Sequence, residues 1–145
     1  MMTKTVNRDV ANLKRSAEKI NAGETERIAT ASPGDVVRQG DLYLVCLADA
    51  PKEGKIIQDR QLAPGTTQGS RHVVEGDCVI RTKNTNAIQQ LHPSTPKELI
   101  GPSIECISDC PVTHPQHGDK ILPGGTSWGV VYQRAFADEI RRIQD

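Results

Sequence analysis

Short β-forming runs separated by glycine and proline turns constrain the fold of this chain more than any other feature. The run from Leu42 to Leu47 is almost continuously apolar, which is typical of a buried central strand. The turns that bound such runs lie at Pro33-Gly34-Asp35, Gly40-Asp41, Ala63-Pro64-Gly65, Glu75-Gly76-Asp77 and Pro123-Gly124-Gly125. Because strands follow one another roughly every 10–15 residues, the pattern predicts a mainly β fold, a small antiparallel barrel or sandwich.

Helical periodicity is expected at the two ends of the chain. Apolar residues recur at helical spacing between Val6 and Ile20 with charged residues opposite, which predicts an N-terminal amphipathic helix. Phe136, Ile140 and Ile143 have the spacing of a short C-terminal helix. Residues 84–98 are polar and twice interrupted by proline, so we expect a surface excursion there. These elements divide the chain into an N-terminal helical arm, residues 1–23, and a single β-rich domain, residues 24–145.

Composition excludes several classes of protein. Lys and Arg together number 18, as do Asp and Glu, and aromatic residues make up 3% of the chain. Neutral charge and few rings argue against a nucleic-acid partner held by bulk attraction or base stacking. No apolar run is long enough to cross a bilayer, and the N-terminus lacks the apolar segment of a signal peptide. We therefore expect a cytoplasmic protein without a membrane partner, in which the four cysteines are thiols, metal ligands or packing residues.

The segment "CISDCPVTHPQH", residues 106–117, carries two cysteines and two histidines in twelve residues. Zinc sites use Cys and His ligands, but their two ligand pairs are commonly separated by a long loop. A local site made of Cys106, Cys110, His114 and His117 is one interpretation. The sequence leaves two further interpretations open.

The second interpretation is a site divided between distant segments. His72 begins a predicted strand, and a β fold can bring it to His114 and His117, giving three imidazoles and an open position for water. Asp119 or Glu75 would supply an oxygen ligand or orient a histidine. Zinc or another divalent metal is the cofactor that such a site implies.

The third interpretation is purely structural. His114 and His117 would then cap a turn, and His72 would be a half-exposed strand residue. Arg134, at the end of the last predicted strand, is a candidate for binding an anionic substrate. The loop that contains Arg71 matches neither glycine-rich phosphate-binding motif, so no nucleotide is expected.

The order "RQGDLYLV", "GSRHVVEGD" and "HPQHGDKILPGGTSWGVVYQR" resembles a group of short, uncharacterised bacterial and phage proteins. These proteins share an RQGD strand, a G-H-x-H element and an H-x-x-H segment followed by LP-x-G and a terminal QR. The likeness covers residues 38–134. This chain has Ser70 where the group has its first histidine, and Trp128 where tyrosine is usual. The resemblance implies a shared β-rich fold and a histidine cluster of three, and it supplies no reaction.

Two functions follow as expectations. The first is a small metal-binding β-domain with His72, His114 and His117 at its site, hydrolytic if the metal activates a water. The alternative is a non-catalytic structural or interaction protein, a subunit of a complex or of a phage particle, that uses its N-terminal helix as a partner-binding arm. A homo-oligomer or a protein complex would suit either function. The sequence does not decide whether the protein is an enzyme.

Overall fold

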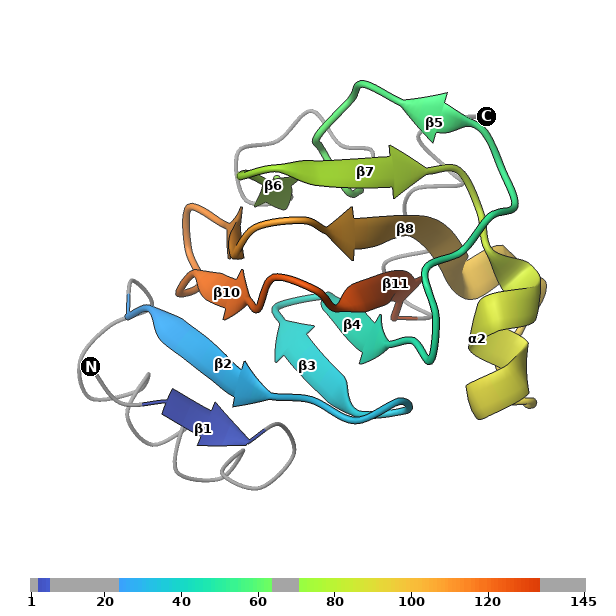
Figure 1. Ribbon diagram of the computed structural model, residues 1–145, viewed down its shortest axis with the longest axis horizontal. Coiled ribbons are helices and arrows are strands. Elements are labelled where there is room, and N and C mark those ends of the chain that lie inside the picture. Colours follow the sequence, from blue (N-terminus) through green and yellow to red (C-terminus); the bar gives the residue numbers. More distant parts are fainter. Residues whose placement is uncertain (1–2, 6–23, 64–70, 134–145) are drawn as a thin grey trace.

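The protein is mainly β, with two sheets and one short helix in the part of the chain that the structure describes (Figure 1). This computed structural model describes residues 3–5, 24–63 and 71–133. The strands are β1 (Thr3–Thr5), β2 (Glu26–Thr30), β3 (Val36–Gln39), β4 (Leu42–Cys46), β5 (Ile56–Ile57), β6 (Val73–Val74), β7 (Cys78–Arg81), β8 (Ile100–Cys106), β9 (Cys110–Thr113), β10 (Lys120–Leu122) and β11 (Ser127–Tyr132). The helix is α2 (Thr85–Leu91), and a single 3-10 turn, η2 (Lys97–Leu99), precedes β8.

The strands form a five-stranded sheet and a six-stranded sheet. Their orders are β1-β2-β10-β9-β6 and β3-β4-β11-β8-β7-β5. All pairs are antiparallel except β1 with β2 and β2 with β10, which are parallel. The mainly β class predicted from the sequence is confirmed. The sheets are not closed, so of the two architectures expected the barrel is not formed.

The main apolar core gathers side chains from both sheets. Strands β4 and β11 contribute Leu42, Leu44 and Val130, and Trp128 of β11 is fully buried within this core. Alternation along β4 and β11 sends every second side chain into this core, as expected for strands with a period of two. Burial of this shared apolar surface is what holds the two sheets together.

A second, smaller core covers the other side of the six-stranded sheet. There Ile88 of α2 packs with Val45, Ile100 and Val131. The expectation of a surface excursion at residues 84–98 was therefore wrong at α2, because Ile88 is completely buried. The segment is polar because α2 buries only Ile88, whereas most surface helices bury a stripe of several apolar residues. The usual helical pattern of apolar residues is therefore absent from the sequence.

Two expectations fall partly or wholly on residues that the structure does not describe. The N-terminal helix was expected between residues 6 and 20, and the C-terminal helix between 136 and 143; both lie outside the described residues. Thr3–Thr5 is described, and it pairs with β2 as the edge strand β1 of the five-stranded sheet. None of the described helices is long or apolar enough to cross a membrane.

The contact between α2 and β11 gives a test of this packing. A Cβ added at Gly129 would overlap Cδ1 of Ile88. Gly129→Ala should therefore lower the free energy of unfolding by about 1–3 kcal/mol through overpacking. Ile88→Val removes Cδ1 and by itself costs about 0.5–1.5 kcal/mol. In urea denaturation, the double variant should be more stable than the sum of the two losses predicts, whereas simple additivity would contradict the contact.

Candidate histidine site

The structure brings His72, His114 and His117 together, and we call these three residues the histidine row. His72 immediately precedes β6 and His114 immediately follows β9, and these strands pair with Val73 opposite Thr113. The ring centroids of His72 and His114 are 4.4 Å apart, and those of His114 and His117 are 4.5 Å apart. His72 is 1% exposed and His114 is 7% exposed, while His117 is exposed. The row therefore runs from the core to the surface.

Gln39, at the end of β3, holds His72 through a buried amide. Its Nε2 donates to the carbonyl oxygens of Val112 (2.8 Å) and Gly118 (3.0 Å), so its Oε1 must face Nδ1 of His72, 2.8 Å away. An amide oxygen can only accept, and Nδ1 of His72 must therefore carry the proton. The neutral imidazole of His72 then has its lone pair on Nε2.

His114 has the opposite tautomer. Its Nδ1 accepts hydrogen bonds from the backbone N–H groups of Gln116 (3.0 Å) and His117 (3.2 Å). Because a backbone N–H can only donate, Nδ1 of His114 carries no proton, and in the neutral ring the proton is on Nε2. The side chain of His114 thus caps the turn that follows β9, as the structural interpretation of this residue predicted. The same interpretation was wrong for His72, which is buried and not half-exposed.

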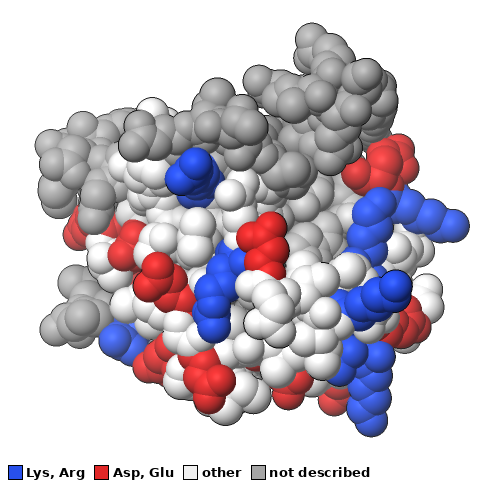
Figure 2. Space-filling view, turned by 90° about the horizontal axis from the view of Figure 1, so that it is seen from above, with Lys and Arg blue, Asp and Glu red and all other residues white. Residues whose placement is uncertain are grey.

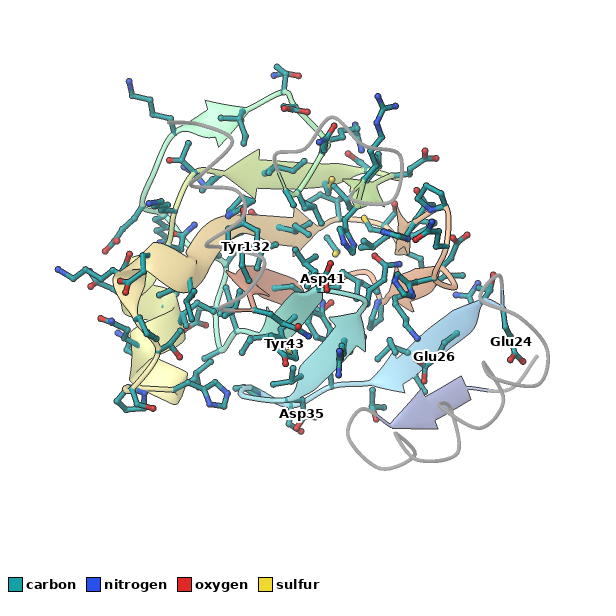
Figure 3. The ribbon with its side chains drawn as sticks, turned by 180° about the vertical axis from the view of Figure 1, so that it is seen from behind. Glu24, Glu26, Asp35, Asp41, Tyr43 and Tyr132 are labelled. Carbon is teal, nitrogen blue, oxygen red and sulfur yellow. The ribbon has the colours of Figure 1, made fainter. Side chains whose placement is uncertain are left out.

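His117 lies against the turn between β3 and β4. A Cβ added at Gly40, whose φ is +57°, would come within 2.6 Å of Cδ2 and Nε2 of His117. Gly40 is therefore required twice, for its left-handed backbone and for the room it leaves to the ring. Figure 3 labels Asp41 at this turn and Asp35 at the opposite end of the β3–β4 hairpin.

The row is not arranged as a metal centre in this conformation. Among residues 3–5, 24–63 and 71–133, no group of three or more His, Cys, Asp and Glu side chains is placed to hold a metal ion. The physical reason lies in the tilted, stacked rings, with interplanar angles of 48° and 41°, and in the backbone donors that occupy Nδ1 of His114. Three nitrogens aimed at one point would need a different turn at residues 114–117.

The two predicted cysteine ligands lie elsewhere. Cys110 begins β9 and His114 follows its end, so the extended strand separates the two Cα atoms by roughly 13 Å. Cys106 and Cys110 are instead packed in the main core. A single local site made of these cysteines with His114 and His117 is therefore not what the fold forms.

The other predicted residues are distributed as follows. Glu75 is exposed and its backbone N–H donates to Pro111, toward the cysteine end of β9. Asp119 precedes β10, and its carbonyl accepts from the backbone of Glu26. The role of orienting His72, which we expected of a carboxylate, is filled by the amide of Gln39. Arg134 lies outside the described residues, so its predicted role in substrate binding stays a prediction.

Burial governs the electrostatics of the row. Loss of hydration lowers the pKa of His72 from 6.5 to about 3, with smaller contributions from His114 and His117. His72 is therefore neutral throughout the physiological range. On the face shown in Figure 2, basic and acidic side chains are interspersed, in keeping with the equal numbers of the two charges.

Comparison with protein-family models, curated proteins and solved structures gave no match to this chain. The resemblance of residues 38–134 to short bacterial and phage proteins thus stays a prediction.

Sequence reasoning missed Gln39, although strand parity contained the information. Val37 and Gln39 are two residues apart in β3, and both are buried while Arg38 between them is exposed. Side chains two residues apart on a strand lie on the same face of the sheet. Because Gln39 is on the same face as the core residue Val37, its amide is buried too. A buried amide in turn demands partners for its oxygen and both of its N–H groups.

The bridging role of Gln39 can be tested by Gln39→Leu. The substitution leaves the carbonyl oxygen of Val112 and the Nδ1–H of His72 buried without this partner, and the partly buried carbonyl of Gly118 also loses its donor. Since each unsatisfied buried group costs about 1–3 kcal/mol, we expect a loss of at least about 2 kcal/mol in urea denaturation. Gln89→Leu is the matched control, because the half-buried amide of Gln89 makes one hydrogen bond, to Thr95 (2.9 Å). A loss at Gln39 no larger than at Gln89 would contradict the bridge.

The depressed pKa of His72 predicts a specific acid sensitivity. Between pH 6.5 and about 3, His72 binds a proton in the unfolded chain but not in the folded protein. The free energy of unfolding therefore falls as the pH falls through this window. The slope from this residue is on the order of 1 kcal/mol per pH unit. His72→Asn keeps an N–H donor for Gln39 but cannot titrate, so its unfolding free energy should fall less steeply between pH 6.5 and 4.

A direct readout accompanies this prediction. In NMR titrations of the wild-type protein, the Cε1–H resonance of His72 should not move above pH 4. A midpoint near pH 6.5 for this resonance would show that the ring is not held neutral by burial.

Proposed function

We propose that this protein is a metal-binding β-domain in which the histidine row takes up one divalent cation, with zinc as the best-suited ion. The observation that carries the proposal is the tautomer of His72. Metal-bound histidines characteristically donate their second ring N–H to a protein acceptor, which fixes the ring and leaves the other nitrogen as ligand. The bond from Nδ1 of His72 to Gln39 is of this kind.

The protonation state of His72 supports the same function. A histidine must be neutral to coordinate a metal, and proton competition ordinarily weakens binding below neutral pH. Burial keeps His72 neutral far below that point. The exposed ring of His117 provides a second ligand at the surface, where a hydrated cation would arrive first.

His114 would have to change in order to become the third ligand. Its Nε2 can bind a cation only if that nitrogen loses its proton, and the proton on the ring would then belong on Nδ1. An Nδ1–H cannot accept from the backbone of Gln116 and His117, so the turn at residues 114–117 would rearrange as the metal binds. Binding is therefore coupled to a local conformational change, which lowers the apparent affinity.

Hydrolysis is the reaction class that such a centre would serve. Three imidazole ligands leave a coordination position for water, and a divalent cation lowers the pKa of that water toward 7. The interaction-protein alternative depends on the predicted helix at residues 6–20, outside the described residues, and no described feature favours it.

Calorimetric titration of the untagged, reduced protein with Zn²⁺ tests the proposal. We expect one ion per chain, and His117→Gln should weaken binding by roughly tenfold or more, since a ligand is lost. His117 is exposed, so this variant should fold normally. His92→Gln is the matched control: the ring of His92 contacts the carbonyl of Gly34 (3.0 Å), outside the row, and binding should be unchanged.

Two further readouts separate this site from the cysteines. The Co²⁺ complex should lack a thiolate-to-metal charge-transfer band, and Zn²⁺ should shift the backbone amide resonances of Gln116 and His117. Zinc binding that survives His117→Gln unchanged, or that brings a thiolate band, would overturn the proposal.

A further inference from the structure

Three of the four cysteines meet at the far end of β9 from the histidine row; we call Cys78, Cys106 and Cys110 the thiol cluster. All three pack in or against the main core, and all three are free thiols. Cys78 of β7 is directly opposite Cys106 of β8 in the six-stranded sheet. Cys110, which begins β9, reaches back to the same place, with its Sγ 3.4 Å from the carbonyl oxygen of Asp77.

The backbone around Cys106 fixes how close Cys78 comes. The N–H of Cys106 donates to Thr126 (2.9 Å), and its carbonyl accepts from Gly125 (2.8 Å), so both groups face away from β7. Cys78 and Cys106 are therefore a non-hydrogen-bonded cross-strand pair, the type whose Cα atoms are closest, at roughly 4.5 Å. Disulfides span Cα separations of roughly 4.4–6.8 Å, so the pair can be bridged without moving the strands.

The three thiols differ in accessibility. Cys106 and Cys110 are buried, whereas Cys78 is partly exposed. Arg60 donates from Nη1 to Sγ of Cys78 (3.6 Å), and the same nitrogen is held by the carbonyls of Val74 (3.2 Å) and Gly76 (2.9 Å). A cation thus lies beside the most accessible of these three sulfurs, where it would attract an anionic reagent.

We propose that the thiol cluster is a thiol–disulfide exchange site, in which Cys78 reacts with a low-molecular-weight disulfide and passes the oxidation to Cys106. This site is independent of the histidine row.

The exchange takes two steps. The thiolate of Cys78 attacks one sulfur of the disulfide R–S–S–R, the S–S bond breaks, and RS⁻ leaves, giving a mixed disulfide on Cys78. Cys106 then loses its proton and attacks the sulfur of Cys78, forming the Cys78–Cys106 bond and releasing the second RS⁻. The two protons lost by the cysteines end on the two RSH products. Two electrons have passed from the protein to the reagent.

The second step is slow near neutral pH. Burial raises the pKa of Cys106, and the neighbouring thiols of Cys110 and Cys78 raise it further, against a smaller opposite effect from Thr126. Since only the thiolate attacks, closure of the internal disulfide should accelerate roughly tenfold per pH unit between pH 7 and 9.

The experiment uses glutathione disulfide, an anionic reagent, with the full-length reduced protein. Samples are quenched in acid, alkylated and analysed by mass spectrometry for the order of events. We expect a mixed disulfide on Cys78 first, followed by its replacement with a bond between the tryptic peptides 72–81 and 98–120. The second peptide carries both Cys106 and Cys110, so fragmentation between them must assign the bond to Cys106.

Variants complete the test. Cys78→Ser, at the partly exposed position, should abolish both species, while Cys110→Ala should retain the bond. Cys46→Ala is the matched control, because Cys46 is a buried thiol opposite Trp128 and not opposite a cysteine; it too should retain the bond. A mixed disulfide that never closes, a bond to Cys110, or equal oxidation of Cys78→Ser would each overturn the proposal. Circular dichroism of each variant checks that it is folded.

Discussion

The buried amide of Gln39 is the interaction on which the site depends. Gln39 belongs to the six-stranded sheet, and its three partners, His72, Val112 and Gly118, belong to or flank the other sheet. Apolar packing can hold two sheets together but is not directional. A buried amide with every donor and acceptor satisfied has one geometry, so it fixes the register of the two sheets where the histidines lie. It also decides which nitrogen of His72 is free.

Two glycines near Gln39 lie where the neighbouring atoms leave no room for a side chain. Gly118 contributes a carbonyl to Gln39, and a Cβ on Gly118 would overlap the carbonyl oxygen of Glu24. Gly40 leaves room for the ring of His117. The partly buried ion pair between Lys120 and Glu26 (3.1 Å) joins the parallel strands β2 and β10 next to the same turn. If the turn at residues 114–117 changes, the surrounding strands and the β3–β4 turn have to keep their positions.

Strand β9 separates two kinds of chemistry. At its first residue is Cys110, with the buried thiols, and directly after its last residue is His114, with the imidazoles. In the sequence these residues form one compact motif, and a single local metal site was one of the three interpretations of that motif. Because an extended chain advances about 3.3 Å per residue, the strand divides the motif into a proposed cation site and a proposed thiol–disulfide site. Pro111 does not bend the chain, because it lies within β9, which pairs with both β6 and β10.

Local sequence patterns determined the mainly β class, the turn at Gly40-Asp41 and the central strand at Leu42–Cys46, because turn chemistry and side-chain alternation act over a few residues. They also placed His72 at the start of a strand and His114 at a turn. The pairing of β6 with β9, the partners of Gln39, and the cross-strand position of Cys78 and Cys106 were decided only by the tertiary structure. These contacts join residues 28 to 79 positions apart, and such distant pairings depend on how whole sheets pack. No spacing rule within a single segment specifies them.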